Sequence, residues 1–376
     1  MGKMFWIVLA ILVLLLCVYC VILLNRMVSL SEKLQKNRKA CILVKAGILV
    51  GIILLVAFCK ASIAFFFYAA IVSLCMEPIY FLFRKRKGMQ FLKKSALIPI
   101  AVGVVITVVG FFLMRHFVRT EYVIETAKLP AGQEYQILFI SDLHYGNSIH
   151  KKQIDSLVAE WREEEWDAVI IGGDLIDENT SRVELTEVLS AIGTIETKEG
   201  IFCVNGNHDG FSLEHEKLSI EEYQRMLDEY HIIFLQDAYR ILGFANIVLF
   251  GRKDRSEQRI STLRLEEELL VRDVYSSTAI PGNAFRILID HQPNELYDEA
   301  KEGFDLTLCG HTHAGQFWPI GLFHEPFHLN DLVYGIRQFD DMTAIVSSGL
   351  SGWYAPIRTE GPSEYVVITI RGTGNN

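Results

Sequence analysis

The chain has 376 residues, of which 51% are hydrophobic, and its mean hydropathy is +0.25. These values are high for a soluble protein of this length, so they argue against a wholly water-soluble chain and indicate that part of it lies in lipid. Residues 1–120 carry 16 Lys or Arg against 2 Asp or Glu, and the remainder carries 20 against 43. The net charge of −9 is therefore the sum of a positive charge on a basic membrane region and a larger negative charge on an acidic water-soluble domain.

Four apolar stretches in the first 120 residues each approach the ~20 residues that a membrane-spanning helix requires. They lie at about 5–25, 41–59, 62–83 and 96–114. The sequence therefore predicts a transmembrane region of four helices over residues 1–120. For the first stretch, a cleaved signal peptide is the alternative.

Basic residues gather in two of the three loops that connect these stretches. The first loop carries five Lys or Arg and the third carries six, whereas the second has only Lys60. Cationic loops tend to stay on the cytoplasmic side. We therefore expect a multi-pass protein of the cell membrane, with both termini and the C-terminal domain outside the cytoplasm.

From residue 121 onward, short apolar runs rich in Ile and Val alternate with amphipathic, acidic stretches. The runs are typical of buried strands, and they read YQILFI, DAVIIGG, GIFCVNG, HIIFLQD, NIVLFG, FRILID, DLTLCG, TAIVSSG and EYVVITI. Helical spacing of apolar residues occurs at 151–164, 183–193, 219–230 and 262–272. The predicted class is α/β, in a second domain at residues 121–376.

Residues of the types that bind metals follow the carboxyl ends of five of these strands. They are Asp142, His144, Asp174, Asn207, His208, His291, His311 and His313. In an open α/β sheet, five strands can aim such side chains into one cleft. The spacings Asp-x-His and His-x-His are expected to place two ligands on one side of an extended segment. Each motif alone could be structural, but together they predict a pair of divalent metal ions.

The motifs resemble the ordered signature of the calcineurin-like metallophosphoesterase superfamily. The chain shows SDLHYG, GGDLID, GNHD, IDHQP and GHTHAGQ in the expected order, within about residues 132–371. The ending GHTHAGQ and the later SSGL and PIR are similar to the bacterial membrane-associated, YkuE-like branch. Asp177-Glu178-Asn179 stands where protein phosphatases typically carry Asp-Arg-Gly, which argues against that activity. The resemblance implies a four-layer αββα sandwich.

The same resemblance implies a role for each residue of the motifs. One metal ion would be held by Asp142, His144 and His313, the other by Asn207, His291 and His311, and Asp174 would bridge both. The ions would be two divalent cations such as Mn, Fe or Zn. His208 would protonate the leaving oxygen, and Asp209 would orient its ring. Arg252 and Arg358 resemble family positions near the cleft, where each could bind phosphate or be an ordinary surface residue.

These observations predict a metal-dependent phosphoric ester hydrolase. The expected activity is that of a membrane-anchored phosphodiesterase, which hydrolyses a lipid-linked or membrane-proximal phosphoester by metal-activated hydroxide. A phosphomonoesterase of the same mechanism and a non-catalytic membrane signalling or scaffold protein are the alternatives. The predicted partners are the phosphoester substrate and the bilayer, and no nucleic acid is expected.

The segment FWPIGLFHEPFH at residues 317–328 is unusually aromatic for a stretch that follows a metal motif. Aromatic side chains favour interfaces that have one wet side. Two interpretations stay open, namely a rim that faces lipid or grips the substrate, and ordinary packing in the core.

Overall fold

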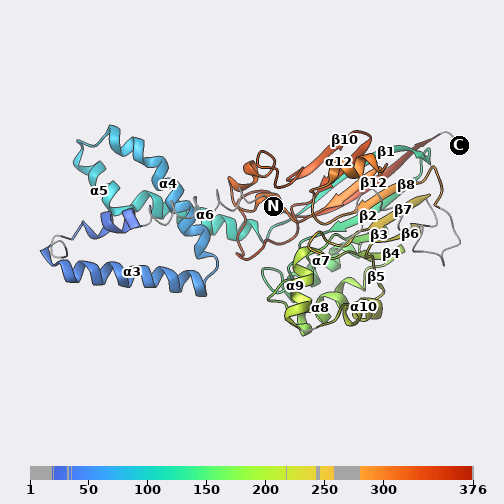
Figure 1. The fold of residues 1–376 in the computed structure, drawn as a ribbon, viewed down its shortest axis with the longest axis horizontal. Helices are drawn as coiled ribbons and strands as arrows, with labels where there is room; N and C mark the ends of the chain where they lie inside the picture. Colours follow the sequence, from blue (N-terminus) through green and yellow to red (C-terminus); the bar gives the residue numbers. More distant parts are fainter. Residues whose placement is uncertain are drawn as a thin grey trace. The chain divides into compact units, whose positions relative to one another are not determined.

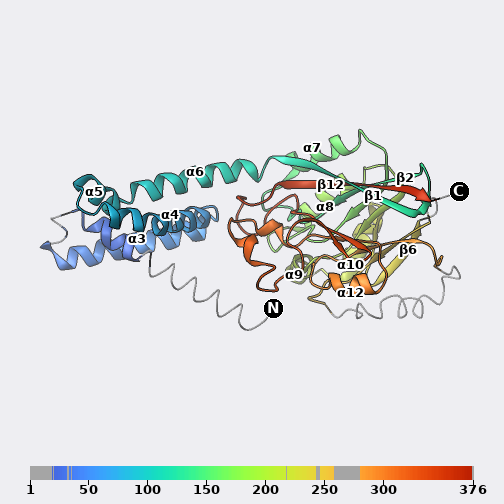
Figure 2. The same ribbon diagram turned by 90° about the horizontal axis from the view of Figure 1, so that it is seen from above.

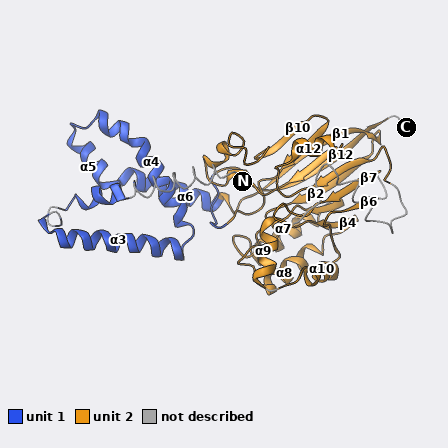
Figure 3. Ribbon diagram, viewed as in Figure 1, with its two compact units in different colours: residues 1–112, 354–359 blue, residues 113–353, 360–376 orange. Residues whose placement is uncertain are grey.

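The computed structural model describes residues 19, 21–31, 34, 36–216, 218–242, 246–257 and 280–374. The chain divides into two compact units (Figure 3). The helical unit comprises Met1–Phe112 and Tyr354–Thr359, and the sheet unit comprises Leu113–Trp353 and Glu360–Asn376. The domain boundary predicted at residues 120/121 stays a prediction; strand β1, Phe117–Pro130, runs across it.

In the described part of the helical unit, residues 21–28 are helical, and four further helices follow them. They are α3 (Arg38–Phe58), α4 (Ser62–Leu82), α5 (Lys87–Ser95) and α6 (Leu97–Leu113). Helices α3 and α4 are long and apolar enough to cross a membrane. Helices α5 and α6 qualify only as one bent pair, with an angle of 48° between them. This gives two membrane-spanning candidates, or three if the bent pair counts as one.

The expectation of four transmembrane helices is therefore met only in part. The stretches at 41–59 and 62–83 correspond to α3 and α4, but the stretch at 96–114 corresponds to α6, which has only 17 residues. The short helix arises because Ala96, in a left-handed conformation, ends α5 and separates it from α6. The first stretch, at 5–25, lies mostly outside the described residues.

Twelve strands of the sheet unit form two six-stranded sheets (Figure 1). The first sheet has the order β1 (Phe117–Pro130), β12 (Ser363–Gly374), β2 (Glu134–Ile140), β3 (Trp166–Ile171), β4 (Thr197–Cys203) and β5 (Ile232–Phe234). The second has the order β10 (Gly335–Phe339), β11 (Met342–Val346), β9 (Leu306–Cys309), β8 (Phe285–Ile289), β7 (Ile247–Gly251) and β6 (Ala238–Leu242). All nine predicted apolar runs form strands; β1, β6 and β10 are additional.

Each sheet is parallel in its central strands. In the first sheet, β2, β3, β4 and β5 run parallel, and in the second, β7, β8, β9 and β11 do. Antiparallel pairs join β12 to β2, β10 to β11 and β6 to β7. The carboxyl ends of the parallel strands therefore collect at one edge of each sheet.

Helices cover the outer faces of the sheets (Figures 1 and 2). They are α7 (Lys151–Trp161), α8 (Arg182–Ile192), α9 (Asn207–His215), α10 (Ile220–Glu229) and α12 (Leu296–Lys301). The helices predicted at 151–164, 183–193 and 219–230 correspond to α7, α8 and α10, while 262–272 lies outside the described residues. Two 3-10 turns, η2 (His313–Gly315) and η3 (Ile320–Phe323), follow β9.

Alternate residues of the central strands face different cores, because successive side chains of a strand point to opposite sides. In β2, Leu138 and Ile140 join the cluster that contains the apolar faces of α7, α8 and α10. Ile137 and Phe139 join a second cluster with residues of β8 and β9. A third cluster combines the other face of the second sheet with Leu296 of α12. The second cluster thus joins the two sheets face to face, and the two-sheet α/β architecture is confirmed.

Candidate metal centre

The candidate ligands come from strand ends in both sheets. Asp142 and His144 follow β2, Asp174 follows β3, and Asn207 is the first residue of α9 after β4. His291 follows β8, and both His311 and His313 follow β9 of the second sheet. The structure brings all seven into one region, where they form two groups of donor atoms close enough to hold metal ions.

Six of the candidate ligands form two groups of three. The first group is Asp142, His144 and His313, and the second is Asp174, His291 and His311; within each group the donor atoms lie within 4.8 Å of one another. Asn207 adjoins the second group, because its Oδ1 lies 2.7 Å from Nδ1 of His311. His311 and His313, two residues apart in sequence, thus belong to different groups.

Asp174 lies between the two groups. Its Oδ2 is 3.1 Å from Nε2 of His291 in the second group and 3.7 Å from Nε2 of His144 in the first. Its Oδ1 accepts a hydrogen bond from the backbone N–H of His208. One carboxylate is therefore within reach of both groups of ligands.

The backbone at these positions differs from the extended segments that the sequence predicts. Asp142, His144, Asp174, His311 and His313 all have φ between 41° and 71°, the left-handed region that non-glycine residues rarely adopt. The two pairs are therefore not held by extended strands: Asp142 and His144 still join one group, whereas His311 and His313 belong to different groups. Such conformations cost about 1–3 kcal/mol each and persist where the surroundings impose them, commonly at functional sites.

Glycines next to these residues allow the close approach of the chain. A Cβ added to Gly310 would lie 2.2 Å from Oδ2 of Asp142, and one added to Gly206 would lie 2.2 Å from Oδ1 of Asp174. Both distances are far below a normal contact. Only glycine leaves room for the two carboxylates at these positions.

Two buried nitrogens of the site have no hydrogen-bond partner among the described residues. They are the two ring nitrogens of His144. An unsatisfied buried polar group costs about 1–3 kcal/mol. Nδ1 of His291 lies 2.8 Å from the carbonyl oxygen of Gly172, an arrangement that orients a metal-binding imidazole. The donor set and its orphaned nitrogens fit divalent metal ions.

Burial shifts the pKa values of the site in both directions. Burial raises the pKa of Asp142 to about 6, despite the nearby His291, and Asp174 adds to the rise. Burial opposes ionisation of Asp174 as well, but His291 and His144 hold its pKa below the usual range. Burial also lowers the pKa of His144 to about 4. His144 is therefore neutral near pH 7, as a metal ligand must be.

The ring of His208 is oriented by a residue that the sequence analysis did not assign. Its Nδ1 lies 2.8 Å from Oε1 of Glu178. The ring centroid lies 5.2 Å from that of His144 and 5.6 Å from that of Trp353. Glu178 follows Asp177 of the GGDLID motif directly, but nothing in its spacing distinguishes it from a surface glutamate. Trp353 lies in no motif that would have marked it as a neighbour of His208.

Asp209 makes different contacts from those expected. Its carboxylate accepts hydrogen bonds from the backbone N–H groups of Asp174, Gly206 and Ile176, at 2.8, 2.7 and 3.0 Å. These bonds hold together the chain segments that follow β3 and β4. Asp209 thus organises the backbone of the site, and the role of orienting the His208 ring stays a prediction for it.

The two arginines occupy separate environments. Arg252 is buried, and its guanidinium lies 3.0 Å from Asp290 and 3.2 Å from Glu295. Arg358 is also buried and belongs to the segment 354–359 of the helical unit, where its backbone N–H donates to the carbonyl of Gly110. A role in binding phosphate stays a prediction for both.

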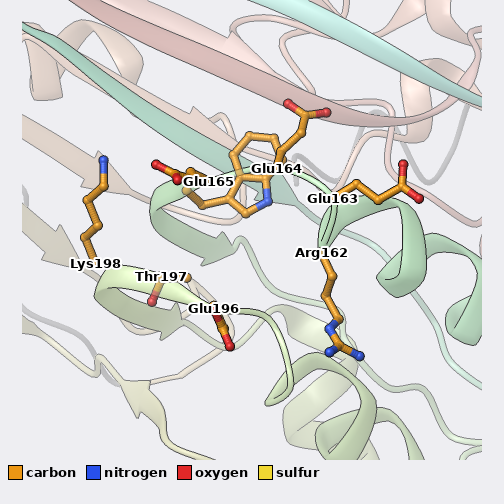
Figure 4. Close-up of a pocket in the computed structure, with 8 residues that line it drawn as sticks. Arg162, Glu163, Glu164, Glu165, Glu196, Thr197 and Lys198 are labelled. Carbon is orange, nitrogen blue, oxygen red and sulfur yellow. The ribbon is translucent and has the colours of Figure 1, made fainter.

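A surface hollow lies at the amino ends of β3 and β4, opposite to the ends that the ligands follow (Figure 4). Residues 162–166 and 196–198 line it. Four of these eight residues are glutamates, which repel a phosphate group. The hollow is thus separate from the candidate metal centre and is poorly suited to a phosphoester.

Comparison with known proteins shows what the sheet unit is similar to. The model of the calcineurin-like phosphoesterase family matches residues 135–315. An uncharacterized metallophosphoesterase of Helicobacter pylori is 29% identical over 309 residues, which cover 79% of this chain and 75% of the relative. The uncharacterized metallophosphoesterase YkuE of Bacillus subtilis is 24% identical over 77% of this chain and 99% of its own length.

A third relative has a more specific name. Phosphodiesterase YaeI of Escherichia coli is 26% identical over 225 residues, covering 58% of this chain and 76% of the relative. The resemblance to YkuE-like proteins is confirmed by these matches. The chain carries a calcineurin-like metallophosphoesterase domain, which makes it a metal-dependent phosphoric ester hydrolase.

Proposed function

We propose that the protein is a membrane-anchored phosphodiesterase that hydrolyses a lipid-linked or membrane-proximal phosphoester with two divalent metal ions. The observation that carries this proposal is the convergence of two buried donor groups at the carboxyl ends of strands from both sheets. The similarity to phosphodiesterase YaeI supports a diester as the substrate.

The geometry supports the following assignment of ligands. Asp142, His144 and His313 would hold one ion, Asn207, His291 and His311 the other, and Asp174 would contact both. The mixture of imidazole, carboxylate and amide donors suits Mn, Fe or Zn. When bound, two such cations polarise phosphoryl oxygens and lower the pKa of a coordinated water.

The residues around the ligands have distinct tasks in this proposal. His208 donates a proton to the leaving oxygen. Glu178 is 2.8 Å from Nδ1 of its ring, so the opposite nitrogen, Nε2, is the one left for the substrate. Asp209 acts as a positioning residue, because its three backbone hydrogen bonds hold Asp174 and the chain before Asn207 in place.

The apolar helices support a location in the cell membrane. Helices α3 and α4 have the length and composition of membrane spans. The match to the Helicobacter pylori relative covers 79% of the chain, about 297 residues, which is more than the 256 residues of 121–376. The similarity therefore extends into the apolar third. The basic residues between α4 and α6 support a cytoplasmic location for that loop and a location outside the cytoplasm for the sheet unit.

Removing the metal ions is expected to destabilise the sheet unit. Ligands that bind only the native state stabilise it by about 3 kcal/mol at a concentration of roughly one hundred times Kd. Full-length protein in detergent should therefore show a lower midpoint of thermal unfolding with EDTA than with added Mn²⁺ or Zn²⁺. The matched variant Asp174→Asn should show a smaller difference. Equal midpoints with and without metal would contradict the assignment.

Metal affinity is expected to fall in acid. Because burial raises the pKa of Asp142 to about 6, a proton competes with the cation at this carboxylate as the pH falls through that value. His144, whose pKa is about 4, does not contribute in this range. Against the effect of burial, Asp174 raises the pKa of His291, so that a proton also competes with the cation there. Isothermal titration with Mn²⁺ should show affinity weakening by up to about ten-fold per pH unit below pH ~6. A constant affinity would exclude Asp142 as a ligand.

Glu178→Gln is expected to lower kcat and leave KM nearly unchanged. The substitution keeps the size of the side chain but weakens the charge-assisted hydrogen bond that orients His208. Since general acid catalysis contributes about 10²–10⁴-fold, His208→Ala should lose that factor and Glu178→Gln a part of it. Glu163→Gln, in the hollow at the opposite strand ends, is the control. A rise in KM alone would refute this role.

The substrate class can be tested with paired chromogenic substrates. Full-length protein with added Mn²⁺ should hydrolyse bis(p-nitrophenyl) phosphate faster than p-nitrophenyl phosphate, and His208→Ala should abolish most of the diesterase activity. A preference for the monoester would favour a phosphomonoesterase. Bound metal without turnover of either substrate would count against the proposed activity.

A further inference from the structure

Exposed apolar side chains of the sheet unit are concentrated in one place. Of the eleven large apolar side chains that are exposed in its described part, six lie between Trp318 and Phe327 or at Trp353. We call Trp318, Ile320, Leu322, Phe323, Phe327 and Trp353 the aromatic rim. Their exposed fractions are between 38% and 61%, so packing in the core does not explain this segment. Contiguous exposed apolar surface commonly marks a site of interaction.

The backbone beneath the rim is held firmly. Gly315 has a φ of +87°, and a Cβ added there would lie 2.3 Å from the backbone nitrogen of Gly321. That nitrogen donates to the carboxylate of Glu360 at 2.9 Å. The side chain of Gln316 bonds both the N–H and the carbonyl of Trp353, at 3.0 and 3.1 Å. The apolar side chains are thus presented outward by a fixed turn.

The rim borders the candidate metal centre. The segment begins five residues after His313, a member of the first donor group. The remaining member of the rim, Trp353, has its ring 5.6 Å from that of His208. A surface that bound the rim would therefore meet the residue proposed to protonate the leaving group.

The chain enters and leaves the sheet unit beside this rim. Met114 follows α6 directly, and its Cε lies 2.5 Å from where a Cβ on Gly352 would be. The residue after Trp353 begins the segment 354–359, which belongs to the helical unit. Within that unit Thr359 is hydrogen-bonded to Tyr68 of α4. Two covalent connections to the membrane helices thus start next to the rim.

We propose that the aromatic rim inserts into the hydrocarbon boundary of the lipid bilayer, so that the metal centre acts on the phosphoester of a membrane lipid. The occupant is lipid because both tethers lead from the rim to apolar helices, and because Trp and Phe side chains favour the interfacial region of a membrane. Insertion of an apolar surface by about 5–10 Å is typical of interfacial binding. The insertion stands independently, whereas the substrate class rests on the proposed function.

Bromine-labelled lipids test the insertion without any need for activity. Full-length protein is reconstituted in vesicles of phosphatidylcholine, with either plain or dibrominated acyl chains. The tryptophan emission that Trp318→Phe removes should be quenched in the brominated vesicles, because bromine quenches only at close range. Trp161 and Trp166, both buried in the sheet unit, serve as internal references. Equal intensity of this component in the two vesicles would overturn the proposal.

Paired substrates test the consequence for catalysis. The double variant Leu322→Ser and Phe323→Ser should reduce kcat/KM for dioleoyl phosphatidylglycerol at least about ten-fold more than for bis(p-nitrophenyl) phosphate, since two large side chains lose their contact with hydrocarbon. Val183→Ser, an exposed apolar residue of α8, is the matched control and should leave the ratio unchanged. Equal losses on both substrates would overturn the link between rim and lipid. A wild-type protein inactive on both substrates would count against the proposed function, while the quenching result would still decide the insertion.

Discussion

The sheet unit buries four carboxylates and three imidazoles in one small region, and the electrostatics of that burial govern the rest of the site. Asp142, Asp174, Asp177 and Asp209 are buried there, together with His144, His291 and His313. Removing charges from water costs several kcal/mol per ion unless each charge finds a partner. Protein partners satisfy only some of these groups. Asp209 is satisfied by three backbone N–H groups, whereas His144 has no hydrogen bond at either ring nitrogen. Bound cations would supply the partners that the remaining carboxylates and imidazoles lack.

The packing of the two sheets sets the distances within this centre. The first sheet provides the strand ends before Asp142, Asp174 and Asn207, and the second provides those before His291 and His311. The apolar cluster between the sheets contains buried residues of β2, β3, β8 and β9. Because interiors are closely packed, this cluster holds the two sets of strand ends at a constant separation. The geometry of the candidate metal centre thus depends on the core as well as on the candidate ligands.

The aromatic rim and the candidate metal centre lie next to each other in the sheet unit. Trp353 contacts His208 and immediately precedes the segment that belongs to the helical unit. The sheet unit therefore combines a polar centre with a neighbouring apolar surface. A lipid phosphoester has the same two parts, a charged head and a hydrocarbon tail. This complementarity links the proposed chemistry to the proposed insertion.

The sequence by itself determined the strands and pointed to the candidate ligands. Every predicted apolar run that is bounded by Gly, Asp or Asn forms a strand. Strands that are buried on both faces are rich in Ile and Val, and the turns between them use only a few residue types, so both are visible in the sequence. The motif order then identified the seven residues that the structure brings together in one region. Composition also revealed the apolar third, although hydropathy does not reveal that the left-handed Ala96 separates α6 from α5.

Only the tertiary structure decided how these residues are used. The left-handed backbone of Asp142 and His144, the contact of Glu178 with His208, and the backbone role of Asp209 all depend on segments that the fold brings together. His291 meets Gly172, 119 residues earlier in the chain, because two sheets pack face to face. The exposure of the aromatic rim also could not be predicted from the sequence, since apolar residues are expected both in a core and on a surface that contacts lipid. Local patterns carry no information about such distant contacts, which arise from the packing of the whole unit.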